Sequence, residues 1–160
     1  MKYKTVLFCL LVFVLLFILV MLLPFLQEPD VYQNYEEGVT IEINNLSGSD
    51  LANLNFSYGY VEDTVTVYKE IGNIERLKPG NTSIIKTKKN KNLNNRGRDT
   101  SIYMNYKLLN GFEINENLVY FNPPQPDKIV LIININQIDS YGNIDYDIRG
   151  FDGVRSFPSY

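Results

Sequence analysis

The residues best suited to chemistry form a run of cations between positions 86 and 98. No acidic residue interrupts this run. Closely spaced cations attract anionic surfaces such as phosphate-rich polymers and lipid headgroups. We therefore expect a basic loop that binds an anionic ligand, with a solvated connection between two strands as the alternative. The cations are Lys86, Lys88, Lys89, Lys91, Arg96 and Arg98.

A second group of side chains carries oxygen ligands of the kind that Ca²⁺ takes. Three of its members alternate with large apolar residues, and the spacing of an EF-hand is absent. The alternative interpretation is therefore the outward polar face of an edge strand, and no other metal site is expected. The group consists of Asp139, Asn143, Asp145 and Asp147.

Several kinds of catalytic site are excluded by composition. The chain has no histidine, and its one cysteine is Cys9. Catalytic triads, Cys–His dyads, the usual zinc sites and a disulfide within the chain are therefore impossible. Carboxylate pairs such as Asp145 and Asp147 exist, but no spacing directs two of them at one reacting atom. We expect neither an enzyme nor a cofactor.

Length and charge narrow the class of protein further. The chain has 160 residues, with 15 basic against 18 acidic side chains and a net charge of −3. This length suits one domain of ordinary size. The acidic balance argues against nucleic acid as a partner, because proteins that bind nucleic acids are usually strongly basic.

The N-terminal segment predicts a membrane anchor. Residues 5–26 carry no charge and are dominated by Leu, Val, Phe and Ile. As a helix they would be about 33 Å long, enough to cross a hydrocarbon core of about 30 Å. Lys2 and Lys4 precede this segment while Glu28 and Asp30 follow it. By the positive-inside rule, the N-terminus is cytoplasmic and the rest of the chain is extracytoplasmic.

A cleaved signal peptide is the alternative to a permanent signal-anchor. Its apolar stretch is usually shorter, about 7–15 residues, and small residues mark its cleavage site. Here the apolar run is longer, and the residues from Leu22 to Asp30 include no small side chain. We therefore divide the chain into a cytoplasmic stub (1–4), a transmembrane signal-anchor (5–26), a linker (27–38) and an extracytoplasmic domain (39–160).

The extracytoplasmic part has the pattern of β-strands. Alternation of apolar and polar residues predicts half-buried strands. It is clearest at 39–44, 53–60, 101–108 and 144–148. The run 129–133 is apolar throughout, which is typical of a central strand covered on both faces.

Turn signals separate these strands. Pro79-Gly80 fits a type II turn, and Asn110-Gly111 predicts a hairpin that pairs 101–109 with 112–121. A second hairpin is expected around Gly142. About eight short strands joined in this way indicate an all-β, antiparallel, immunoglobulin-like sandwich preceded by one transmembrane helix.

Two segments carry a resemblance to known proteins. The first is Glu70-Ile71-Gly72-Asn73-Ile74 leading into Leu77-Lys78-Pro79-Gly80, and the second is Ser101-Ile102-Tyr103-Met104-Asn105-Tyr106 with its Asn-Gly hairpin. With them the chain resembles the uncharacterised small membrane-anchored extracytoplasmic β-sandwich proteins of Gram-positive bacteria. The resemblance implies a fold and a cellular location, and it carries no catalytic residue.

Location and fold together favour a binding role. We expect a single-pass membrane protein, held in the cell membrane by residues 5–26, whose outer β-sandwich is a protein-interaction module. Its partner would lie at the membrane or the cell surface and would dock on a sheet face or an exposed sheet edge. The alternative is binding of anionic envelope polymers or lipid headgroups through the basic loop 86–98.

Overall fold

The computed structural model describes residues 12–14, 31–62, 64–88, 100–121, 127–153 and 156–157. The chain divides into two units, Met1–Gln33 and Asn34–Tyr160, and all the strands lie in the second. Of the predicted transmembrane segment 5–26, residues 12–14 are helical and the others lie outside the described residues. Within the described residues, no helix has the length and apolar character to span a bilayer.

Period-two alternation gives strands along most of the second unit, which confirms the predicted all-β class. The described strands are β1 (Gly38–Asn45), β2 (Leu51–Glu62), β3 (Val65–Leu77), β4 (Thr82–Thr87), β5 (Thr100–Lys107), β6 (Glu113–Phe121), β7 (Lys128–Ile138), β8 (Ile144–Phe151) and β9 (Ser156–Phe157).

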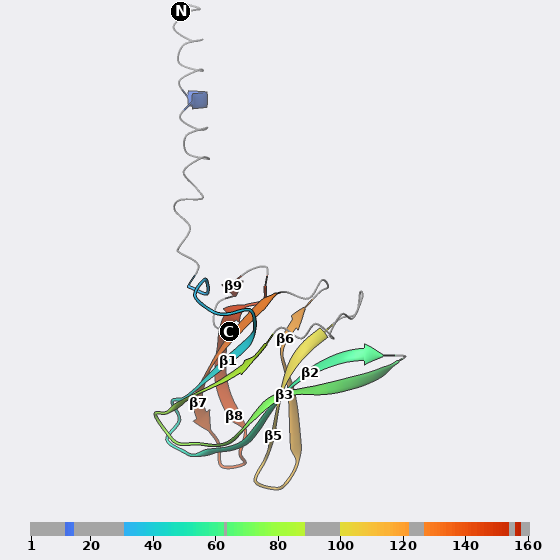
Figure 1. Ribbon diagram of the computed structural model, residues 1–160. Helices are drawn as coiled ribbons and strands as arrows, with labels where there is room; N and C mark the ends of the chain where they lie inside the picture. The colour runs from blue at the N-terminus through green and yellow to red at the C-terminus, as the bar shows by residue number, and fades with distance from the viewer. Residues whose placement is uncertain are drawn as a thin grey trace, which may run out of the picture. The chain divides into compact units, whose positions relative to one another are not determined.

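The strands form two sheets that share one core (Figure 1). The first sheet has the order β4-β1-β7-β8-β9, and the second has the order β3-β2-β5-β6. Hairpins join β2 to β3, β5 to β6 and β7 to β8. The chain crosses from one sheet to the other after β1, after β3, after β4 and after β6. The predicted central strand is confirmed, because β7 lies in the middle of its sheet and residues 129–133 are all buried.

One strand pair departs from the predicted antiparallel arrangement. β1 runs parallel to β7 over the whole length of β1, from Gly38 opposite Lys128 to Asn45 opposite Ile135. The other pairs of described strands are antiparallel. A parallel pair needs a long crossover, and here five intervening strands supply it. No local sequence signal could have indicated this pairing, because it depends on which two strands meet after the other sheet has formed.

The core lies between the two sheets and is filled by the inward side chains of both. Strands β1 and β7 of the first sheet face strands β2 and β5 of the second. Side chains that are at most 1 % exposed mark its centre: Ile41, Ile43, Leu54, Phe56, Ile102, Met104, Leu131, Ile133 and Ile135.

The predicted turns are present. Gly80 has a φ of +75°, and the Asn81 N–H donates to the Lys78 carbonyl oxygen, as a type II turn requires. The β5–β6 and β7–β8 hairpins both have three-residue loops that end on a glycine of positive φ, Gly111 and Gly142. This is a type I turn followed by a bulge, rather than the two-residue turn that Asn-Gly most often forms.

One predicted boundary is corrected, and the C-terminal segment contains a further short strand. Lys86 belongs to β4, where it lies opposite Thr40 of β1, so the basic segment begins inside a strand rather than in a loop. The C-terminal segment supplies a two-residue strand, β9, which pairs with the end of β8.

Candidate functional site

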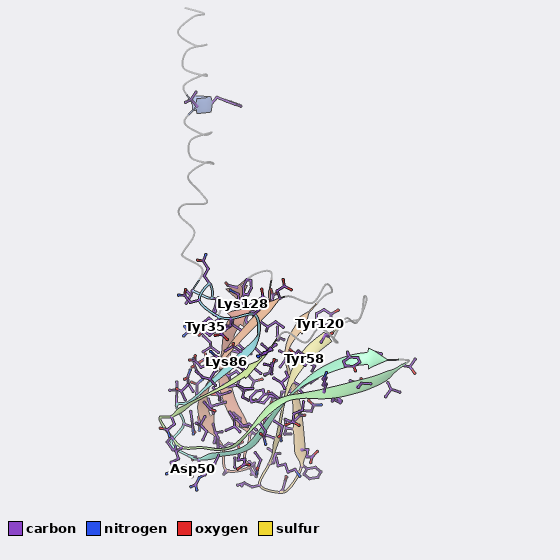
Figure 2. The ribbon with its side chains drawn as sticks, in the orientation of Figure 1. Tyr35, Asp50, Tyr58, Lys86, Tyr120 and Lys128 are labelled. Carbon is purple, nitrogen blue, oxygen red and sulfur yellow. The ribbon has the colours of Figure 1, made fainter. Side chains whose placement is uncertain are left out.

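The structure describes only the first part of the predicted basic loop. Lys86 and Lys88 are both exposed, Lys86 on β4 and Lys88 just beyond its end. Figure 2 labels Lys86 on the five-stranded sheet, away from Tyr120 on β6 of the other sheet. The other predicted cations, Lys89, Lys91, Arg96 and Arg98, lie outside the described residues.

The predicted calcium ligands are only partly brought together. The Asp139 carboxylate accepts hydrogen bonds from the backbone N–H groups of Tyr141 and Asn143, both at 2.8 Å, and from Asn143 Nδ2 at 2.7 Å. These bonds, first of all the one from the Asn143 side chain, lower the pKa of Asp139. Asp139 and Asn143 therefore fold the β7–β8 turn with their own polar atoms.

The other two members of the group lie on β8. The Asp147 carboxylate accepts hydrogen bonds from Asn134 Nδ2 at 2.9 Å and from Asn136 Nδ2 at 3.4 Å, while Asp145 is exposed. The described residues contain no group of three or more His, Cys, Asp or Glu side chains that could hold a metal ion.

The hairpin tips form a site that sequence reasoning did not single out. We call Leu109, Phe112 and Tyr141 the tip cluster; their exposed fractions are 81 %, 70 % and 69 %. Both hairpins reach the lower end of the domain in Figure 1. The Leu109 N–H donates to the Tyr141 carbonyl oxygen at 3.0 Å, which joins a loop of one sheet to a loop of the other.

Several contacts hold the tip cluster in a fixed shape. The Phe112 N–H donates to Asn110 Oδ1 at 3.0 Å, and Asp139 anchors the backbone on either side of Gly142. A Cβ atom at Gly142 would lie 3.1 Å from the Leu109 nitrogen, so the two loops touch closely there. The tip cluster is thus made of large apolar side chains on two loops that are fixed before any partner binds.

A polar cluster lies behind the tips and ties the sheets together. Tyr106 of β5 donates a hydrogen bond to Glu116 Oε1 of β6 at 3.0 Å, and Tyr146 of β8 donates to Glu116 Oε2. One carboxylate thus joins a strand of each sheet through two phenols. Burial, followed by the bond to Glu116, raises the pKa of Tyr106 to about 12 and raises the pKa of Tyr146 as well.

The raised tyrosine pKa predicts a loss of stability in alkaline solution. An unfolded chain releases the Tyr106 proton near pH 10, whereas the folded chain keeps it up to about pH 12. Because the unfolded state then binds fewer protons, the free energy of unfolding should fall as the pH rises through this interval. Urea midpoints should be measured between about pH 10 and pH 12. They should fall less steeply with pH for Tyr106→Phe than for the native chain. Equal slopes would contradict this assignment.

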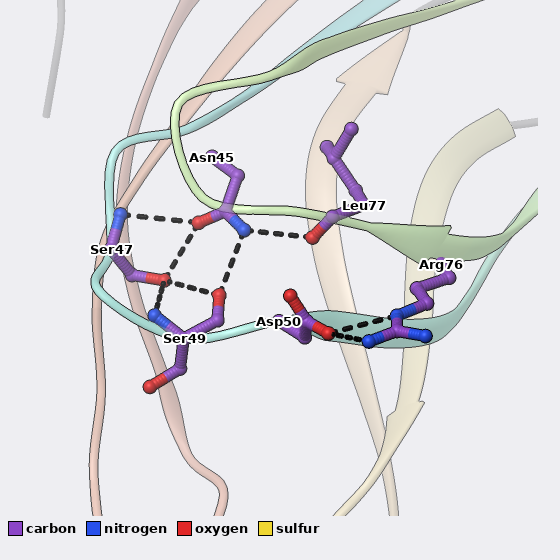
Figure 3. A network of polar contacts seen from close by, with 6 residues as sticks. All are labelled: Asn45, Ser47, Ser49, Asp50, Arg76 and Leu77. Atoms are coloured by element: carbon purple, nitrogen blue, oxygen red, sulfur yellow. Dashed lines mark hydrogen bonds and ion pairs between the residues drawn. The ribbon is translucent and has the colours of Figure 1, made fainter.

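A buried asparagine shapes the neighbouring loop at the same end of the domain (Figure 3). Asn45 is fully buried, and its Nδ2 donates to the carbonyl oxygens of Ser49 and Leu77, both at 2.9 Å. Its Oδ1 accepts from the N–H of Ser47 at 3.1 Å and from Ser47 Oγ at 2.7 Å. All four hydrogen-bonding positions of the amide are used. Beside it, Asp50 pairs with Arg76.

A signal for the tip cluster was present in the sequence. Leu109 and Phe112 flank the Asn-Gly pair, and Tyr141 lies inside the second turn. Large apolar side chains are thus present at both turns. What the sequence could not show is that the two turns touch. No protein family matches the chain, and no curated protein or solved structure matches it.

Proposed function

We propose that the chain is a single-pass membrane protein whose β-sandwich is an extracytoplasmic protein-interaction module. The observation that carries the proposal is the tip cluster, three large apolar side chains that are mostly exposed on two hydrogen-bonded loops. Interfaces draw most of their binding energy from a few such side chains, especially aromatic ones. Loops fixed beforehand also lose less conformational entropy when a partner binds.

The position of the tip cluster supports this role. The cluster lies where β5 and β7 end, whereas the chain enters the sandwich at Gly38, at the start of β1. Because β1 and β7 run parallel, Gly38 lies at the opposite end of the sheet. The tip cluster is therefore on the end of the domain opposite to Gly38, where the chain enters the sandwich.

The strand order supports an immunoglobulin-like fold for this module. In such folds one sheet has the order G-F-C-C′, and strands B and E pair in the other. Strands β6-β5-β2-β3 and the antiparallel pair β1–β4 follow the same orders. β7 then takes the place of strand A beside β1, but it runs parallel to β1. Immunoglobulin-like domains commonly bind proteins through loops at one end of the sandwich.

Polar replacement of the tip cluster should abolish partner capture. In an in-cell crosslinking pull-down of the full-length protein, a variant with Leu109→Ser, Phe112→Ser and Tyr141→Ser should recover at least about tenfold less partner. Its urea midpoint should change little, because exposed substitutions rarely alter stability. The matched control is Val65→Ser with Ile84→Ser, which removes two exposed apolar side chains elsewhere. Undiminished capture by the tip variant would refute the proposal.

The alternative function is binding of an anionic envelope polymer or headgroup. Lys86 favours it, because this exposed side chain lies opposite Thr40 rather than a carboxylate. Such binding should weaken sharply at high salt, whereas binding through an apolar tip should not. A variant with Lys86, Lys88, Lys89 and Lys91 replaced by Gln should lose it. If that variant retains polymer binding, the alternative fails.

A further inference from the structure

The outer face of the four-stranded sheet carries tyrosines, asparagines and serines in register. We call it the tyrosine–asparagine face. It consists of three rows, each of which crosses the sheet from β3 through β2 and β5 to β6. The rows are Asn73–Asn55–Asn105–Asn115, Glu70–Ser57–Tyr103–Asn117 and Tyr68–Gly59–Ser101–Tyr120.

Two tyrosine rings lie over the middle of this face. A Cβ atom on Gly59 would overlap the Tyr103 ring and lie 3.2 Å from the Tyr68 ring, so the glycine makes room for both. The two rings meet edge to face, with centroids 5.3 Å apart and an interplanar angle of 79°. Tyr68 remains 50 % exposed. An aromatic surface is therefore held in place on the outside of the sheet.

Tyr68 spans the face from one edge of the sheet toward the other. Asn115 Nδ2 donates to the Tyr68 hydroxyl at 3.2 Å, although β3 and β6 are the two edge strands. The phenol must therefore lie along the surface, across the strands between them. A ring that lies along a surface offers a flat apolar area to a ligand placed on top of it.

Amide and hydroxyl groups surround the two rings. Asn105 Nδ2 donates to Ser57 Oγ at 3.4 Å, and Asn117 Nδ2 donates to Ser101 Oγ at 3.1 Å. Among the described residues, these bonds and the one to Tyr68 use one N–H of each amide. The carbonyl oxygen and the second N–H of Asn105, Asn115 and Asn117 remain for hydrogen bonds to a ligand.

The chemistry of the face selects an uncharged ligand. Glu70 is the single charged side chain in the three rows, and it lies on an edge strand. A suitable ligand has no net charge, many hydroxyl or amide groups, and flat patches of C–H bonds that pack on the negative face of an aromatic ring. Pyranose sugars combine these properties. Neighbouring strands are about 4.8 Å apart, which is close to the length of one pyranose unit in an extended chain.

We propose that the tyrosine–asparagine face binds a neutral, extended β-1,4-linked pyranose chain. The half-exposed Tyr68 ring packs on its sugar rings, Tyr103 supports Tyr68 through their edge-to-face contact, and the asparagines hydrogen-bond to its hydroxyl or acetamido groups. The chain lies across the strands, so that successive sugars contact successive strands. This site differs from the tip cluster in residues and in ligand. Its test therefore does not depend on the proposed protein interaction.

Isothermal titration of the full-length protein with cellohexaose and with chitohexaose tests the proposal. A polyoxyethylene detergent should be used, so that no sugar headgroup competes. We expect at least one hexaose to bind, and Tyr68→Ala to weaken its binding about tenfold. Tyr68→Phe keeps the ring but loses the bond from Asn115, so its loss should be smaller. Tyr141→Ala in the tip cluster is the matched control and should bind like the native chain.

Two outcomes would overturn the proposal. The first is that neither hexaose binds. If Tyr68→Ala then loses a protein partner in the pull-down, the face is a protein interface instead. The second is that folded Tyr68→Ala binds a hexaose as tightly as the native chain. Asn117→Ala is a second variant with little risk to folding, because Asn117 is exposed, and it too should bind more weakly. Retained hexaose binding by the tip variant would separate the two sites.

Discussion

Replacing Gly150 with alanine is expected to lower the free energy of unfolding by about 4 kcal/mol or more. Gly150 lies in β8 beside the central strand β7, opposite Leu131. An added Cβ atom would overlap the Val130 carbonyl oxygen and lie 3.0 Å from Phe157 Cζ. The carbonyl belongs to the backbone of the central strand, so it cannot move aside without disturbing the β7–β8 hydrogen bonds.

The size of this effect can be measured by urea unfolding followed by tyrosine fluorescence, since the chain contains no tryptophan. Domains of this size have about 5–15 kcal/mol of stability, so the variant should be largely unfolded or unfold at much lower urea concentration. Gly48→Ala is the matched control, because a Cβ atom there meets nothing within 4 Å. A Gly150→Ala midpoint close to that of the control would show that the strands can separate at little cost.

Asn45→Ala should be the second most damaging change, with a loss of about 3 kcal/mol. The substitution leaves the Leu77 carbonyl oxygen without its side-chain donor and the Ser47 N–H without its acceptor, while the Ser49 carbonyl oxygen keeps only the bond from Ser47 Oγ. Each buried polar group that loses its partner costs about 1–3 kcal/mol. The loop after β1 and the end of β3 would both be released, since Asn45 bonds to each of them.

Thermal unfolding measures this effect with a matched control. A loss of about 3 kcal/mol corresponds to a decrease in Tm on the order of 10 °C for a domain of this size. Asn136→Ala removes an exposed asparagine whose hydrogen bond to Asp147 is 3.4 Å long, and it should leave Tm nearly unchanged. Similar Tm values for the two variants would mean that water replaces the lost bonds around Asn45.

Local patterns predicted most of the strands and both hairpins that a turn signal marks, β5–β6 and β7–β8. Alternation was enough for β2, β5 and β8, because a half-buried strand requires it. The unbroken apolar run 129–133 indicated the central strand, since both its faces are covered. Basic composition was a poorer guide, because it assigned Lys86 to a loop although β4 extends through that position.

The candidate sites depend on contacts that no local pattern contains. The tip cluster exists because Leu109 and Tyr141, which lie on hairpin loops of different sheets, share a hydrogen bond. The polar cluster around Glu116 likewise needs Tyr106 and Tyr146 to meet across the core. The tyrosine–asparagine face requires the register of four strands. Sequence reasoning singled out none of these three groups, because their partners are fixed only by the way the sheets pack.

The parallel pairing of β1 with β7 has a consequence for how the protein is made. Asn44 of β1 and Asn134 of β7, which bond to each other, are 90 residues apart. While the ribosome is still producing β2 to β6, one edge of β1 therefore has no strand beside it. Pairings between such distant segments form slowly, and an open edge can join a foreign strand meanwhile. The open edge of β1 in the nascent chain would thus need shielding until β7 has been synthesised, at Ile138.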